Sequence, residues 1–139
     1  MHDRTSHARQ WLAKADSDLM ASRRLLDGGG PYDAVCFHAQ QAAEKALKAW
    51  LAVADAAIPR THNLEDLQAQ CLALPPMEIT SGIEALDLSD LTPFAVEARY
   101  DIEFWPERVE AEAAVAIAAR VCTAVAGIVE ALKERGGLI

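Results

Sequence analysis

Four polar side chains recur along the helix that the sequence predicts from Tyr32 to about Asp55. They occur in the run FHAQQAAEKALKAW, residues 37–50, at intervals of three, four and three residues, and are His38, Gln41, Lys45 and Lys48. Such spacing places all four on one stripe of a helix. Glu44 lies beside them and precedes Lys48 by four residues, the favourable order for an ion pair on a helix.

This stripe offers an imidazole, an amide and two ammonium groups, all of which can donate hydrogen bonds to phosphate oxygens. It therefore predicts a cleft that receives nucleotide phosphates or an acidic partner surface. The alternative is a solvated face opposite the Ala and Leu residues, and the pattern leaves both open. Gln40 and Gln41, adjacent in mid-helix, indicate hydrogen bonds between helices or subunits.

Two further groups of residues are candidates for chemistry. His62 precedes Asn63, the expected cap of a third helix, and either fixes the turn by a hydrogen bond or acts as a base. Arg60 lies two residues before it. Arg99 and Tyr100 stand beside several acids, where an ion pair and a ligand contact are both plausible.

Other kinds of site find no support in the sequence, so we expect no metal and no cofactor. The Glu-x-x-His spacing of a di-iron bundle does not occur. The glycines at 28–30 lie between two predicted helices, so they indicate a turn and no phosphate loop. Cys36, Cys71 and Cys122 are widely spaced among apolar residues, which predicts core positions and neither disulfides nor a zinc site.

The elements that must position these residues are helices. Apolar residues at intervals of three and four predict a first helix from Thr5 or Ser6 to Leu26 and a last helix from Pro106 to about Arg135. We expect His2 and His7 in a frayed N-terminus. We expect Pro31 to be the first residue of the second helix. A third helix should be capped by Asn63 and stopped by Pro75–Pro76, and a short helix capped by Ser81 should include Ile83 and Leu86. Thr92–Pro93 should interrupt the chain, and residues 94–104 should be partly extended or irregular.

These helices fit a single all-α domain over residues 1–139, with a core at about 6–135. At 139 residues and 52% hydrophobic composition, the chain can bury one core as an up-and-down bundle of four to five helices. The N-terminal residues have no secretory pattern and no stretch resembles a membrane span, so we expect a cytoplasmic protein that does not engage a membrane.

The charge is divided unequally along the chain. Residues 1–60 carry eight Lys and Arg against seven Asp and Glu, whereas residues 61–139 carry five against fourteen. Overall acidity argues against duplex DNA as a partner, because such binding depends on neutralising phosphates. A ligand with phosphate groups is therefore expected in the first half.

Five motifs in this order resemble the HEPN domain over residues 8–130: ADSDL (15–19), GGGPYDAV (28–35), CFHAQQAAEKALKAWL (36–51), RTHNLEDL (60–67) and ARYD (98–101). The chain is similar in particular to stand-alone prokaryotic members that accompany minimal nucleotidyltransferases. The resemblance implies a HEPN-like helical bundle, a homodimer, and a role with nucleotides, RNA or a nucleotidyltransferase chain, often as one half of a toxin–antitoxin pair.

One departure from the HEPN pattern bears on ribonuclease activity. Many HEPN proteins are metal-independent ribonucleases in which a His follows an Arg after four to six residues. No Arg of this chain has a His at that spacing, and Arg99 is followed by YDIEFWP. Binding is therefore favoured over cleavage. The alternatives are a ribonuclease toxin with a non-standard set drawn from Arg60, His62 and Arg99, and a purely structural dimeric interaction module.

Overall fold

The computed structural model describes residues 3–75 and 82–136 of the chain. Regular structure in these residues is entirely helical, which confirms the expected all-α bundle. The elements, in chain order, are α1 (Arg4–Asp27), α2 (Tyr32–Val53), α3 (Leu64–Leu72), the 3-10 turns η1 (Ile83–Ala85) and η2 (Thr92–Ala95), α4 (Glu97–Tyr100) and α5 (Arg108–Gly136).

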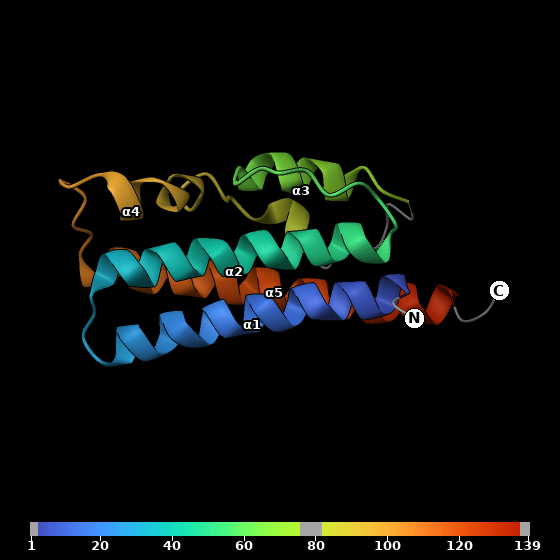
Figure 1. Cartoon of the computed structure of the whole chain (residues 1–139), viewed down its shortest axis with the longest axis horizontal. Helices are drawn as coiled ribbons and strands as arrows, with labels where there is room; N and C mark the ends of the chain where they lie inside the picture. Colours follow the sequence, from blue (N-terminus) through green and yellow to red (C-terminus); the bar gives the residue numbers. More distant parts are fainter. Residues whose placement is uncertain (1–2, 76–81, 137–139) are drawn as a thin grey trace.

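Three long helices, α1, α2 and α5, lie side by side along the length of the molecule (Figure 1). α1 and α2 form an antiparallel hairpin. The segment that contains α3, η1, η2 and α4 covers the side of α2 away from α1 and returns the chain to the end where α5 begins. α2 is therefore surrounded by other elements, and three of its polar residues, Gln40, Glu44 and Lys48, are buried.

Alanine lines the contacts among the long helices. Its small side chain lets neighbouring backbones approach closely while it favours helix formation. The fully buried alanines are Ala8 and Ala15 of α1, Ala39, Ala42, Ala43, Ala46 and Ala49 of α2, and Ala111 and Ala118 of α5.

The turn between α1 and α2 uses glycine as expected. Gly29 and Gly30 have φ values of 88° and 109°, a left-handed region that glycine enters without steric cost. Pro31 is the N-cap of α2 rather than its first helical residue. Nearby, the buried Ser22 hydroxyl donates to the carbonyl of Val35 at 2.8 Å and links the two helices.

Several predicted boundaries were wrong. Asp3 caps α1 and accepts a hydrogen bond from the Ser6 amide at 2.8 Å, so the helix begins before Thr5. α2 ends at Val53, before Asp55, whose φ of 58° cannot continue a right-handed helix. α5 begins at Arg108 rather than at Pro106.

The middle of the chain agrees in part with the elements predicted from the sequence. Asn63 caps α3 through the Asp66 amide at 2.9 Å, as expected, but α3 ends at Leu72, before the prolines. Ser81 lies outside the described residues, and the short helix expected after it is η1. The stretch 94–104 was expected to be partly extended or irregular; it holds the end of η2 and all of α4, and only its last four residues, 101–104, are irregular, with an extended backbone at Asp101.

α5 is apolar along most of its length. From Arg108 to Glu134 it is long and apolar enough, by length and composition, to cross a membrane. Core helices of soluble bundles share that property, and less than half of the most apolar window is buried inside the chain. The outward face of α5 is therefore apolar as well.

Candidate functional site

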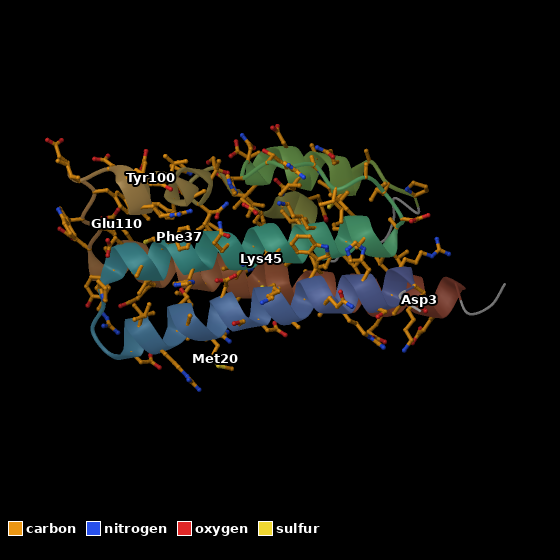
Figure 2. The ribbon with its side chains drawn as sticks, viewed as in Figure 1. Asp3, Met20, Phe37, Lys45, Tyr100 and Glu110 are labelled. Carbon is orange, nitrogen blue, oxygen red and sulfur yellow. The ribbon has the colours of Figure 1, made fainter. Side chains whose placement is uncertain are left out.

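Asp18 of α1 contacts two of the polar residues predicted on α2. Its Oδ1 lies 2.9 Å from Nδ1 of His38, and its Oδ2 accepts a hydrogen bond from Nζ of Lys45 at 2.6 Å. The Asp18 side chain is only 12% exposed. One carboxylate therefore contacts both side chains, and Figure 2 shows Lys45 on α2 beside α1.

Glu44 is the centre of a second cluster on α2. Its carboxylate is 5% exposed and accepts hydrogen bonds from Nζ of Lys48 at 3.1 Å and from Nε2 of Gln40 at 3.2 Å. Nδ1 of His62 lies 2.7 Å from its Oε1. A buried carboxylate with three donors is well satisfied, and this arrangement points to a structural role.

The two adjacent glutamines extend this cluster. Gln40 is fully buried, and its Nε2 also donates to the carbonyl of His62 at 3.0 Å. Gln41 donates to Oε1 of Gln40 at 2.7 Å. Gln40 thus links α2 to the chain before α3 and Gln41 bonds within α2, so neither of these contacts is the expected hydrogen bond between two helices.

The predicted stripe is therefore divided between two ion-pair clusters. His38 and Lys45 contact Asp18, whereas Lys48 contacts Glu44 and lies 5.7 Å from the centre of the Trp11 ring. The solvated-face alternative is wrong, because the Lys48 side chain is only 10% exposed. Lys45, with 25% of its side chain exposed, still reaches the surface.

Lys45 reaches the surface in an open groove along α1. The other lining residues are His7, Gln10, Trp11, Ala13, Lys14 and Ser17. Nε1 of Trp11 donates to Nε2 of His7 at 3.2 Å. The expectation that His7 lies in a frayed end was therefore wrong, since His7 is part of α1. His2 lies outside the described residues.

The groove combines side chains that suit a nucleotide. An indole face can stack on a base, and ammonium groups can bind phosphate oxygens. Lys14 is exposed and has no ion-pair partner among the described residues. Lys45 uses one of its three N–H donors on Asp18, which leaves two for a ligand.

Arg99 and Tyr100 lie on α4, and Arg99 reaches the first cluster only through Phe37, whose ring meets the His38 ring edge-on with centroids 5.4 Å apart. The Arg99 guanidinium lies 5.3 Å from the centre of the Phe37 ring and 5.1 Å from that of Tyr100. Phe37 precedes Glu44 by seven residues, about 10 Å along α2. Arg60 is exposed, and in the described part of the chain no hydrogen bond or ion pair joins Arg60 or Arg99 to His62.

The cysteines are core residues, as the sequence indicated. Cys36, Cys71 and Cys122 are buried free thiols, and burial raises the pKa of each to about 12. They remain protonated at neutral pH and are poor nucleophiles. Across the described ranges, no group of three or more His, Cys, Asp or Glu residues is arranged to hold a metal ion.

Sequence reasoning missed two residues that shape the groove. Trp11 fits the apolar spacing of the first helix, and Asp18 falls within the ADSDL motif, so the sequence singles out neither. A signal was available for Asp18 alone, since it falls on the apolar face of the first helix with Trp11, Ala15 and Ser22, at intervals of four, three and four. An acid on an otherwise apolar helix face requires a partner on the neighbouring helix.

Comparisons with known proteins agree with this architecture. Residues 8–129 match the family model of the HEPN domain. The crystal structure of TT1696 from Thermus thermophilus is similar, with a TM-score of 0.65 and 30% identity over 86% of this chain and 96% of that one. ST0689, described as an archaeal HEPN homologue, has a TM-score of 0.62 and 25% identity over 93% and 99%. No curated protein matches the chain.

Proposed function

Because the chain belongs to the HEPN domain family, we propose that it is a non-catalytic HEPN module that binds a nucleotide in the groove along α1. The observation that carries the proposal is the presence of Trp11, Lys14 and Lys45 in one groove. In this arrangement the Trp11 ring stacks on the base, and the two lysines donate to the phosphates.

Asp18 positions Lys45 for this role. The carboxylate holds the Lys45 ammonium at 2.6 Å and so limits its rotamers before a ligand arrives. A side chain that is already ordered loses less conformational entropy on binding. Asp18 also lowers the net positive charge of the groove, which favours a ligand with few phosphates over a long polyanion.

The HEPN resemblance supplies the biological setting of the proposal. The bound nucleotide would belong to the reaction of a separate minimal nucleotidyltransferase chain, with which this protein pairs in the cytoplasm of a prokaryote. Such pairs often act as toxin and antitoxin. The acidic second half of the chain disfavours duplex DNA and anionic membranes as competing partners.

The proposed module is a homodimer that pairs through the outward face of α5. Ala116, Thr123 and Gly127 are exposed on that face and fall at intervals of seven and four, so they share one stripe. Small side chains allow a second helix to approach closely. Arg120 lies on the same stripe, between Ala116 and Thr123, so the second copy has to accommodate its guanidinium.

Calorimetric titration of the protein with ATP, and separately with the cognate nucleotidyltransferase, tests the proposal. The parent protein should bind ATP, and the Lys14→Ala/Lys45→Ala variant should bind it at least about tenfold more weakly. If the parent binds neither ATP nor the nucleotidyltransferase, the proposal fails and the purely structural module is the better description.

A specific observation favours the ribonuclease alternative. Glu44 holds Nδ1 of His62 at 2.7 Å, while the imidazole is 64% exposed. A carboxylate that orients a histidine is a common arrangement for a general base. RNA cleavage that persists with a chelator and is lost in His62→Ala and Arg60→Ala would establish this alternative. We expect no cleavage above background, because no Arg of the chain is followed by a His at the spacing of the HEPN ribonucleases.

A further inference from the structure

Large apolar side chains are exposed together where α4 leads into α5. Apart from Met20 on α1, every large apolar residue that is more than half exposed in the described chain lies between residues 96 and 109. These residues are Val96, Tyr100, Ile102, Trp105 and Val109, with Ile102 at 87% and Trp105 at 73% exposure. We refer to these five as the 96–109 patch. Patches of exposed apolar residues commonly mark interaction sites.

The same segment carries many uncompensated carboxylates. Glu97, Asp101, Glu103, Glu107 and Glu110 are all exposed, and none is paired with a Lys or Arg within the described part of the chain. Figure 2 shows Tyr100 and Glu110 toward the same end of the molecule. The apolar residues are therefore bordered by negative charge.

The two arginines of this segment are already engaged. Arg108 donates to Glu112 at 2.8 Å, to the Leu26 carbonyl at 3.1 Å and to the Tyr32 hydroxyl at 3.3 Å. Arg99 stacks on the Phe37 and Tyr100 rings. Neither neutralises the five carboxylates, so the surface keeps an excess of negative charge.

We propose that the 96–109 patch docks a basic amphipathic segment of a different protein, one that places apolar side chains against Ile102 and Trp105 and Lys or Arg against the surrounding carboxylates. Exposed Trp and Tyr are the residue types that most often dominate binding energy at interfaces. The carboxylates steer a cationic segment to the patch and select against other partners.

The negative charge around the 96–109 patch disfavours a second copy of the chain, nucleic acids and anionic lipids as its partner. A second copy of the chain docked on the same patch would bring two sets of unpaired carboxylates together, and such like-charge contacts cost several kcal/mol. Nucleic acids and anionic lipid surfaces meet the same repulsion. Val109 lies seven residues before Ala116 and so continues the stripe proposed for the dimer, whereas the other four residues of the patch precede α5. The patch shares no residue with the groove along α1, so this inference does not depend on nucleotide binding there.

Three synthetic helical peptides test the proposal. They share one Leu and Trp face and differ only in their polar positions, which are all Lys, all Gln or all Glu. Titrated into the full-length protein, the Lys peptide should bind at least about tenfold more tightly than the Gln peptide, and the Glu peptide should not bind. Added salt should weaken the Lys peptide most, because its attraction is screened.

Matched variants locate the binding. Ile102→Ser/Trp105→Ser should weaken the Lys peptide at least about tenfold, whereas Met20→Ser, at the exposed apolar residue of α1, should not. Glu103→Gln/Glu107→Gln should weaken it several-fold, whereas Asp16→Asn/Asp27→Asn removes the same charge from α1 and should have little effect. All these residues are exposed, so the variants should fold, as circular dichroism would verify.

Three results would overturn the proposal. The first is failure of the parent protein to bind the Lys peptide, and the second is equal affinity for all three peptides. The third is loss of a dimer in the Ile102→Ser/Trp105→Ser variant by sedimentation, which would show that a second copy covers the patch. None of these results depends on nucleotide binding at Lys14 and Lys45.

Discussion

His62 lies with its Nδ1 2.7 Å from Oε1 of Glu44, although the imidazole is 64% exposed and the carboxylate only 5%. The contact links the chain before α3 to the interior of α2. The same carboxylate accepts from Lys48, so one buried acid connects a surface histidine, a buried lysine and two segments of the fold. This relationship explains why most of the polar residues on α2 support the structure.

We therefore expect Glu44→Ala to lower the free energy of unfolding by about 3–5 kcal/mol, because Lys48 would be left buried without a counter-ion. The control is Glu112→Ala, which removes an exposed carboxylate from an ion pair with Arg108 and should cost at most about 1 kcal/mol. Urea unfolding measures both. Similar losses in the two variants would contradict a structural role for Glu44.

Lys14 and Lys48 should separate binding from stability. Lys14→Ala removes an exposed, unpaired ammonium, so ATP affinity should fall about tenfold while the free energy of unfolding changes by less than about 0.5 kcal/mol. Lys48→Ala leaves Glu44 without its buried ion-pair partner and should destabilise the fold by about 3 kcal/mol, with a smaller change in ATP affinity. The opposite pattern would place the ligand at Glu44 and Lys48.

Dimerisation should depend on the outer face of α5. We expect the parent protein to sediment as two chains, and Ala116→Glu/Thr123→Glu to sediment as one, because two buried carboxylates would oppose association. Met20→Glu on α1 is the control and should leave the mass unchanged. A parent protein that sediments as a single chain at micromolar concentration would rule out the homodimer.

The buried thiols predict a pH dependence of stability. Burial raises the pKa of Cys71 and Cys122 from 9.0 to about 12, so between these values the unfolded chain loses thiol protons that the folded chain retains. Unfolding therefore becomes more favourable as pH rises above about 9, and thiols contribute no such change below it. Urea unfolding at about pH 8 and pH 10 should show a smaller loss of stability in Cys71→Ala than in the parent. Equal losses would show that the Cys71 thiol ionises in the folded chain.

The sequence predicts the helices well because each has a local signal. Apolar spacing gives the three long helices, and Asn63 gives the start of α3. The prediction of helix ends was less accurate. Asp3 acts through a capping hydrogen bond and Asp55 through its left-handed backbone, and composition determines neither. The segment at 94–104 was difficult because η2 and α4 are too short to display a helical period.

The site was harder to predict because it depends on contacts between helices. Lys45 was identified from its neighbours on α2, but its partner Asp18 is 27 residues away on α1. Lys48 looked equivalent to Lys45 by spacing alone, yet the burial of α2 gives the two lysines different partners. Trp11 matched the apolar stripe of α1, and no local feature distinguishes a core tryptophan from one that lines a groove.

The central claim, nucleotide binding beside Trp11, is tested most directly by NMR signals from the three indole N–H groups. Trp11 lines the groove, Trp50 is buried, and Trp105 lies in the 96–109 patch. Substitution of each Trp by Phe assigns the signals. On titration with ATP, the Trp11 signal should shift and saturate while the Trp50 and Trp105 signals stay in place. A Trp11 signal that does not move, or a shift confined to Trp105, would contradict nucleotide binding in the groove along α1.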